Sequence, residues 1–157
     1  MTIGGIIRGM GTALPGAPVT NHDLSQYMDT SDEWIVERTG IRERHVGGTT
    51  VGLSVESGRM ALAAAGLEPG QIDALVLSTT TPDRLVPASS AAVQRELGLS
   101  CGAFDVNAAC SGFVYALDIG AHFVQSHTYN TVLVIGAEKM SSVVDWTDRA
   151  TCVLFGD

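Results

Sequence analysis

The segment Gly102-Ala103-Phe104-Asp105-Val106-Asn107-Ala108-Ala109-Cys110-Ser111-Gly112 is the most informative part of this chain. Its first five residues are typical of a strand, and a helix is expected from Ser111 to about Ser126. A thiol at such a junction lies near unpaired backbone N–H groups and the positive end of a helix dipole, which both favour the thiolate. Small neighbours let a substrate carbonyl approach the sulfur. Cys110 is therefore a candidate nucleophile, and the alternative is a small buried residue that fills a tight turn.

Strands and helices alternate along most of the sequence. Strands are predicted at residues 3–11, 74–79, 102–106 and 131–137, and helices at 21–28 (capped by Asn21), 30–38 (capped by Thr30 or Ser31), 51–65, 90–97 and 111–126. Gly40, Gly66 and Gly98 are expected to end the helices 30–38, 51–65 and 90–97, and Val55 and Leu62 to share one apolar face. Such alternation indicates parallel strands joined by helical crossovers, hence a layered α/β domain with functional groups at the carboxyl ends of the strands. In the helix after Cys110, the residues Leu117, Ala121 and Val124 are expected to face the core. The apolar run 151–155 fits a helix or a strand equally well.

Composition sets limits on the class of protein. With 157 residues, 45% hydrophobic and only 17% charged, the chain is expected to form one domain, residues 1–157, without an internal linker. The net charge of −8 opposes nucleic-acid binding. Apolar runs are too short to span a membrane and no secretory signal is evident, so a cytoplasmic protein is expected. Cys101, Cys110 and Cys152 lack paired spacing, and the histidines lack ligand spacing, so neither a disulfide nor a metal site is indicated.

Three segments together are specific enough to indicate a family. They are DTSDEWIVERTGIRERH at residues 29–45, FDVNAACSGF at 104–113, and TDR at 147–149 leading to LFGD at 154–157. The chain resembles the β-ketoacyl-acyl carrier protein synthase III family, the initiating condensing enzymes of bacterial fatty acid synthesis, which have a thiolase fold. The match runs in the family's order over nearly the whole chain. The resemblance implies that this chain is the amino-terminal half domain of a thiolase fold, with a mixed, mostly parallel sheet.

The resemblance also implies a reaction and a substrate. Cys110 would accept an acyl group from acyl-coenzyme A, without a further cofactor, and pass it to the carbanion formed by decarboxylation of malonyl-acyl carrier protein. Trp34 and Arg149 match the positions that sandwich the adenine of coenzyme A, while Thr30 and Arg38 match contacts to the base or phosphates. If these residues do not bind coenzyme A, Trp34 is expected to anchor the hydrophobic core and Arg38 to be a charged side chain in solvent.

Three residues match the acyl pocket of the family. They are Met140, Phe155 and a loop residue, Val86 or Leu85, which in the family reaches into a partner subunit. An aliphatic residue at this loop position suggests room for a primer longer than acetyl. The sequence leaves the role of two further features open. Arg149 could form an ion pair with Asp145 or Asp148 instead of contacting coenzyme A. The stretch 78–81, Ser-Thr-Thr-Thr, either lines the site or forms a hydroxyl-rich turn.

The family's catalytic histidine and asparagine belong to its second half, as does the basic helix that receives the carrier protein. The chain ends on the turn signal Gly156-Asp157, so the sequence predicts an interrupted polypeptide, completed in cis or by a second chain. Alone it could at most acylate Cys110, and it should not condense. An unpaired sheet edge and an uncovered apolar face are also expected, and a homodimer through residues 101–107.

Other readings share parts of this pattern. Hydroxymethylglutaryl-coenzyme A synthases and chalcone-synthase-like proteins also use a cysteine at this position, although the segment around Trp34 and Arg38 argues against them. From other classes, the chain could be a non-catalytic, partner-completed half or a redox-sensing thiol domain. The sequence leaves the primer and the pathway, fatty acid or polyketide, undecided.

Overall fold

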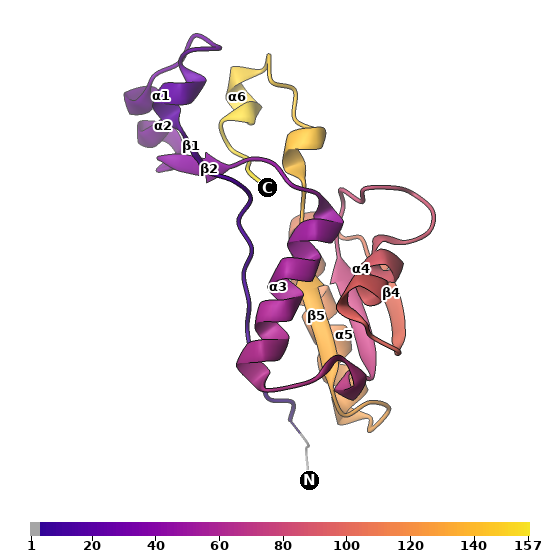
Figure 1. The fold of residues 1–157 in the computed structure, drawn as a ribbon. Helices are drawn as coiled ribbons and strands as arrows, with labels where there is room; N and C mark the ends of the chain where they lie inside the picture. The colour runs from indigo at the N-terminus through magenta and orange to yellow at the C-terminus, as the bar shows by residue number, and fades with distance from the viewer. Residues whose placement is uncertain (1–3) are drawn as a thin grey trace. The chain divides into compact units, whose positions relative to one another are not determined.

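A computed structural model describes residues 4–157 and shows two compact units (Figure 1). The first unit comprises residues 1–13, of which 4–13 are described, and residues 49–138. The second comprises residues 14–48 and 139–157. Each unit is built from two separate stretches, so no single linker divides the chain. This explains why the sequence, read in order, suggested one domain.

A parallel sheet forms the centre of the first unit. Its strands are β3 (Ala74–Ser78), β4 (Gly102–Val106) and β5 (Val132–Gly136), in the order β4-β3-β5. In this register Val76 lies opposite both Phe104 and Val134. Every residue of β3 is buried, as expected for a central strand covered on both faces. The predicted parallel α/β arrangement is confirmed.

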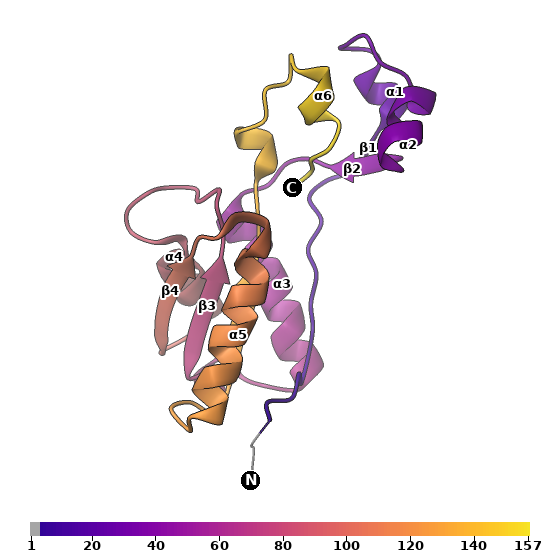
Figure 2. The same ribbon diagram turned by 180° about the vertical axis from the view of Figure 1, so that it is seen from behind.

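Helices cover both faces of this sheet (Figures 1 and 2). Helices α3 (Thr50–Ala65) and α4 (Ser89–Leu97) lie on one face, and α5 (Gly112–Gln125) lies on the other. The predicted stops are confirmed, since α3 ends at Gly66 and α4 at Gly98, both with positive φ. Short 3-10 turns occur at η1 (Pro69–Gln71) and η2 (Ala109–Ser111). Among the described residues no helix is both long and apolar enough to cross a membrane.

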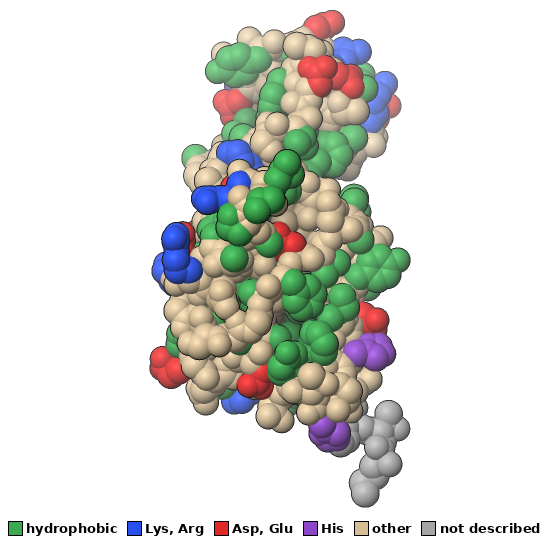
Figure 3. Space-filling model, turned by 90° about the vertical axis from the view of Figure 1, so that its right-hand side faces the viewer, with side chains coloured by type: hydrophobic (Ala, Val, Ile, Leu, Met, Phe, Trp, Pro, Cys, Tyr) green, Lys and Arg blue, Asp and Glu red, His purple; other side chains and the backbone are tan. Residues whose placement is uncertain are grey.

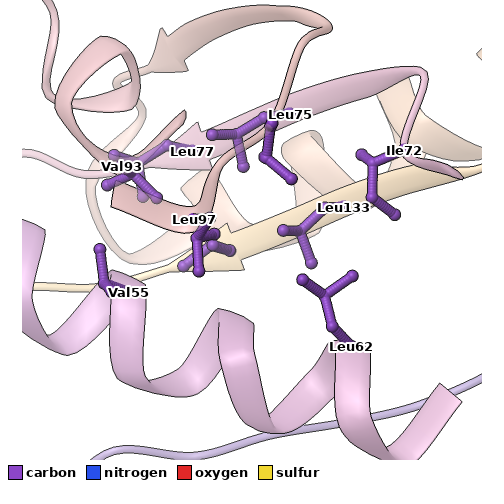
Figure 4. Packing of buried hydrophobic residues seen from close by; sticks show 10 residues of the cluster. Val55, Leu62, Ile72, Leu75, Leu77, Val93, Leu97 and Leu133 are labelled. Atoms are coloured by element: carbon purple, nitrogen blue, oxygen red, sulfur yellow. The ribbon is translucent and has the colours of Figure 1, made fainter. Parts of the chain in front are cut away.

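The core of the first unit lies between α3, α4 and the sheet (Figure 4). Val55 and Leu62 point from α3 toward the strands, as the predicted apolar face requires. Gly58 lies between them, and a Cβ there would be 3.0 Å from Leu97 Cδ1 and 3.3 Å from Ile135 Cδ1. Glycine at this helix position therefore lets α3 approach the sheet closely, which offsets its low helix propensity.

The buried face of α5 differs from the predicted one. Leu117 is 40% exposed and Ala121 and Val124 are only partly buried, so that prediction is wrong. The fully buried positions are instead small residues spaced by four, namely Gly112, Ala116 and Gly120. Small side chains let the helix lie directly on the strands. The larger apolar side chains consequently point outward, and hydrophobic side chains reach the surface of this unit (Figure 3). Those on α5 that are exposed are Phe113, Val114, Tyr115 and Leu117.

The amino-terminal segment is not the strand that the sequence predicted for residues 3–11. Residue 3 lies outside the described residues, and residues 4–11 have no strand assignment. This segment runs along α3, and a Cβ on Gly9 would be 2.5 Å from the Ala61 carbonyl oxygen. Ile6 and Ile7 are exposed. A β-pattern becomes a strand only when a neighbour supplies the ladder hydrogen bonds, and within the described residues none pairs with it.

The second unit consists of short elements. They are β1 (Pro18–Thr20), α1 (Asn21–Leu24), α2 (Asp32–Thr39), β2 (Glu43–His45), η3 (Met140–Ser142) and α6 (Arg149–Cys152). Ser31 caps α2 and Gly40 ends it with φ 74°, as predicted. The cap of α1 is Thr20 rather than Asn21. Asn21 is buried instead, because its Nδ2 donates to Asp32 Oδ1 and to the Ile41 carbonyl oxygen, both at 2.8 Å.

Polar links join the two stretches of the second unit. Arg44 is 6% exposed and donates to the Val19 carbonyl oxygen at 3.3 Å and the Val153 carbonyl oxygen at 3.1 Å. The Asp157 carboxylate accepts hydrogen bonds from the backbone N–H groups of Gly47 and Ser141, each at 2.7 Å. The antiparallel β1–β2 pair was not predicted, because strands of three residues leave no recognisable pattern. The ambiguous run 151–155 is helical only through Cys152.

Candidate active site

Cys110 lies in the 3-10 turn η2, between the end of β4 and the start of α5. The residue is exposed, so it does not fill a buried turn. Ala109 just before it has φ 46°, a left-handed conformation that costs a non-glycine residue about 1 kcal/mol. The chain therefore bends sharply at this point and presents the thiol at the carboxyl edge of the sheet, where the sequence predicted it.

The other two cysteines have different surroundings. Cys152 is fully buried, and Cys101 is partly buried. Burial disfavours a charged thiolate and raises the pKa of both thiols above the usual value. This environment is typical of cysteines that pack inside a fold. Exposure therefore distinguishes Cys110 from both.

The carboxyl edge also holds a residue that the sequence analysis missed. Glu138 follows β5, and its carboxylate accepts hydrogen bonds from the turn at residues 79–81 after β3. The open question about the hydroxyls of this turn is thus answered in part, because Thr79 and Thr81 are buried and bonded to Glu138. Only the parallel pairing of β3 with β5 brings these positions together, since they are separated by 57 to 59 residues.

In the second unit, two arginines lie against one tryptophan. The guanidinium carbon of Arg38 is 4.6 Å from the centroid of the Trp34 ring, and that of Arg149 is 4.5 Å from it. Both distances are within the range of cation–π interactions. Trp34 is partly buried and packs against the small core around Ile35, so it is a core contact and an aromatic platform at once. The structure thus brings together three of the predicted coenzyme A contacts.

Hydrogen bonds hold each arginine in place. Arg38 Nη1 donates to the Trp34 carbonyl oxygen at 3.2 Å, and Arg149 Nη1 donates to the Asp29 carbonyl oxygen at 2.6 Å. Asp29 Oδ2 is 3.9 Å from the same Arg149 nitrogen. The alternative partners of Arg149, Asp145 and Asp148, lie in turns of their own. They accept the backbone N–H of Thr147 and of Ala150, respectively, each at 2.9 Å, and the bonds from Thr147 hold the pKa of Asp145 below its usual value.

Thr30, the fourth predicted contact, precedes the Ser31 cap of α2. Its hydroxyl oxygen is buried and has no hydrogen-bond partner in the part of the chain that the structure describes. A buried hydroxyl without a partner costs about 1–3 kcal/mol. Its unused hydrogen-bonding capacity is compatible with a polar ligand atom.

The predicted acyl-pocket residues are divided between the two units. Val86 belongs to the first unit and is 84% exposed, and the alternative residue Leu85 is 90% exposed. Met140, in η3, and Phe155 belong to the second unit. Their role in an acyl pocket stays a prediction. No group of three or more potential metal ligands occurs among residues 4–157.

Comparison with known proteins agrees with this arrangement. Residues 104–157 match the family model of 3-oxoacyl-[acyl-carrier-protein (ACP)] synthase III. The β-ketoacyl-[acyl-carrier-protein] synthase III of Xanthomonas campestris pv. campestris is 54% identical over 155 residues, which are 96% of this chain and 48% of that protein.

Two solved structures have the same fold. The 3-oxoacyl-[acyl-carrier-protein] synthase III of Aquifex aeolicus VF5 has a TM-score of 0.94 and 48% identity, over 96% of this chain and 50% of that one. The priming β-ketosynthase of the R1128 polyketide pathway has a TM-score of 0.93 and 39% identity, over 96% of this chain and 46% of that one.

The fold is therefore that of the thiolase-like condensing enzymes. Within this class, the chain is homologous to the β-ketoacyl-acyl carrier protein synthase III family, and the resemblance seen in the sequence is confirmed. The chain spans about half the length of the curated relatives that it matches.

Proposed function

We propose that Cys110 is the acyl-accepting nucleophile of an acyltransferase of the synthase III type. The observation that carries this proposal is the exposed thiol at the carboxyl edge of a parallel sheet, between β4 and α5. In the proposed step the thiolate attacks the carbonyl carbon of acyl-coenzyme A. A carbon–sulfur bond to Cys110 forms, the bond to coenzyme A breaks, and coenzyme A leaves as a thiolate.

We infer that the nucleotide end of coenzyme A binds at the Trp34 cluster, defined as Thr30, Trp34, Arg38 and Arg149. An indole ring and a guanidinium are both planar and stack on a purine, and guanidinium groups also pair with phosphates. In a chain of net charge −8, these two arginines provide local positive charge for an anionic ligand. The unpartnered Thr30 hydroxyl supports a polar contact with the same ligand.

The second step, condensation with malonyl-acyl carrier protein, is part of the proposal for the whole enzyme. The family resemblance assigns its histidine and asparagine to sequence beyond the matched half. A homodimer, a cytoplasmic location and a role at the start of fatty acid or polyketide chains are predictions of the same kind. The exposed free edge of β4 and the exposed apolar side of α5 support a further covering partner for this unit.

The acylation step has a direct test. The purified chain is mixed with acyl-coenzyme A, and the mass of the Cys110-containing peptide is measured before and after treatment with hydroxylamine. We expect one acyl group on Cys110, its removal by hydroxylamine, and its loss in Cys110→Ser. The matched control is Cys101→Ser, which should be acylated like the parent chain.

An acyl group that persists in Cys110→Ser would contradict the proposal. So would the absence of any acyl group on a Cys110 that still reacts with iodoacetamide. Rapid oxidation of Cys110 by peroxide without acylation would instead support a redox-sensing thiol. The primer is tested in the same assay, where an aliphatic Val86 predicts acylation by branched or longer acyl-coenzyme A at a rate at least equal to that with acetyl-coenzyme A.

A further inference from the structure

The Glu138 carboxylate holds three consecutive residues of the turn after β3. It accepts the Thr80 N–H at 2.9 Å, the Thr81 N–H at 3.0 Å, the Thr81 hydroxyl at 2.5 Å and the Thr79 hydroxyl at 3.3 Å. Thr79 and Thr81 are only 3% and 6% exposed. Hydrogen bonds to an ionised acceptor are stronger than neutral ones, and here several converge on one carboxylate. Glu138 therefore binds all three residues of this turn at once.

Ser78, the last residue of β3, and Thr79, the first residue of this turn, contact the two ends of the loop that carries Cys110. At the start of the loop, the Thr79 N–H donates to the carbonyl oxygen of Val106, the last residue of β4, at 3.1 Å. At its end, the Ser78 hydroxyl lies directly against Gly112, so closely that a Cβ on Gly112 would overlap it. Cys110 lies between these two contacts, in the stretch 107–111.

We propose that Glu138 is a positioning residue for Cys110. It holds residues 79–81, this turn and the adjoining Ser78 hold the two ends of the 107–112 loop, and the loop sets the direction of the thiol. For acyl transfer this inference rests on the proposed function of Cys110. A carboxylate suits the role because the groups facing it are N–H and O–H donors, whereas a glutamine would replace one acceptor oxygen by an NH2 group.

Asp73 offers a matched control. Its carboxylate accepts the backbone N–H groups of Asn130 and Thr131, at 2.8 and 3.0 Å, and thus holds a turn before β5. This contact is of the same kind but lies at the amino end of the sheet. Five residues of β3, about 15 Å of extended chain, separate the two carboxylate sites. A general loss of stability would affect both sites, whereas a positioning effect on Cys110 would come from Glu138 alone.

The test compares Glu138→Gln with Asp73→Asn in the purified chain. The first measurement is amide hydrogen exchange of a peptide that covers residues 107–112. We expect exchange to become at least about tenfold faster in Glu138→Gln, and to change less than about twofold in Asp73→Asn. Equal acceleration in both variants, or none in Glu138→Gln, would overturn the inference.

The second measurement is the rate of Cys110 acylation as a function of acyl-coenzyme A concentration. In Glu138→Gln we expect a maximal rate reduced at least about tenfold and an unchanged half-saturating concentration, since orientation rather than binding is lost. Iodoacetamide labelling of Cys110, which needs little orientation, should change less than about threefold. An unchanged maximal rate, or an equal loss in Asp73→Asn, would contradict a role in acyl transfer.

A milder variant keeps the inference testable if Glu138→Gln does not fold. Thr81→Val removes one hydroxyl donor to Glu138 but leaves the carboxylate and the backbone contacts, so it should change exchange and acylation in the same direction by a smaller factor. If the parent chain is labelled by iodoacetamide but never acylated, the proposed function fails. The exchange experiment still decides whether Glu138 holds the loop.

Discussion

The two units of this protein are held together in different ways. The first unit has a continuous apolar core between its sheet and α3 and α4, in which Leu75, Leu77 and Val93 are completely buried. The second has a small core, with Ile35 and Cys152 as fully buried members, and elements of only three to eight residues. It depends more on hydrogen bonds that join distant stretches of chain, such as those of Arg44 and Asp157.

This difference matches the two proposed roles, acylation at Cys110 and nucleotide binding at the Trp34 cluster. A large apolar core supports a rigid edge on which a nucleophile can be held in a fixed direction. The Trp34 cluster consists instead of long side chains on short helices, and its two arginines are half exposed. We therefore expect changes in the first unit to affect stability and the rate of acylation, and changes in the cluster to affect binding.

The two tryptophans of the chain, Trp34 and Trp146, both belong to the second unit. Tryptophan fluorescence therefore reports unfolding of that unit. The long helices α3 and α5 belong to the first unit and dominate far-ultraviolet circular dichroism. These two signals allow the comparison between the units to be tested on one sample.

The largest effect is expected for Leu75→Ala. Leu75 is 0% exposed and lies between Ala103 and Leu133 in the sheet. Removing its side chain leaves a cavity and should lower the free energy of unfolding by about 2–5 kcal/mol, measured by urea denaturation with circular dichroism. The control Leu85→Ala, at a position 90% exposed, should change it by less than about 0.5 kcal/mol. Equal effects of the two variants would mean that the first unit lacks a close-packed core.

A somewhat smaller effect is expected for Arg44→Met in the second unit. The Val19 and Val153 carbonyl oxygens lose their donor, which should cost about 1–3 kcal/mol in urea denaturation followed by tryptophan fluorescence. Burial lowers the pKa of Arg44, and its Nε has no hydrogen-bond partner among residues 4–157, so its own burial is unfavourable. An unchanged or more stable Arg44→Met would show that apolar packing, not polar linkage, holds this unit. The exposed Arg42→Met is the matched control.

Arg149→Ala should affect binding more than stability. The guanidinium over Trp34 is part of an exposed ion pair, so its removal should change the free energy of unfolding by less than about 1 kcal/mol. Loss of one stacking partner should raise the half-saturating acyl-coenzyme A concentration in the acylation assay about fivefold. The control Arg95→Ala removes an exposed arginine of the first unit that is also ion-paired. If both variants raise this concentration equally, the Trp34 cluster is not the nucleotide site.

The smallest effect is expected from alkaline pH on the buried thiol of the second unit. Burial raises the pKa of Cys152, so the folded state retains this proton more strongly than the unfolded chain does. Its contribution to stability is complete below the ordinary thiol pKa of about 8.5 and is lost as the pH rises toward the raised value. Urea midpoints followed by fluorescence should therefore fall above about pH 8.5, and fall less in Cys152→Ala. An equal fall in both proteins would assign the effect to other groups.

The acidic residues have a role that composition alone does not show. The charge of −8 argued against nucleic acid, but several carboxylates act inside the fold as acceptors for backbone N–H groups. Asp83 accepts from Thr50 and Val51 at the start of α3, and Asp105 from Ser89 and Ser90 at the start of α4. Neither contact has a sequence signal, because each carboxylate lies 15 to 33 residues from its partners.

Several features of the fold were predictable because their causes are local. The stops at Gly40, Gly66 and Gly98 follow from the left-handed backbone that glycine adopts easily. The strand at 102–106 and its parallel pairing with 74–78 follow from apolar runs that alternate with helices. The position of Cys110 at the carboxyl edge follows from the same alternation.

Other features depend on contacts across the fold. Residues 4–11 carry a strand pattern, yet they form a strand only where another segment supplies hydrogen bonds. In α5, large apolar side chains occur all around the helix, so periodicity alone could not show that Gly112, Ala116 and Gly120 would face the sheet.

Local chemistry in the sequence therefore established the α/β alternation, the helix ends and the position of Cys110 between a strand and a helix, because each depends on residues within a few positions of one another. Only the tertiary structure shows that Arg149 stacks on Trp34 and that Glu138 accepts hydrogen bonds from the turn beside Cys110. They join residues that are far apart in the chain, and an interaction between two side chains depends on their distance in space rather than on their separation in sequence.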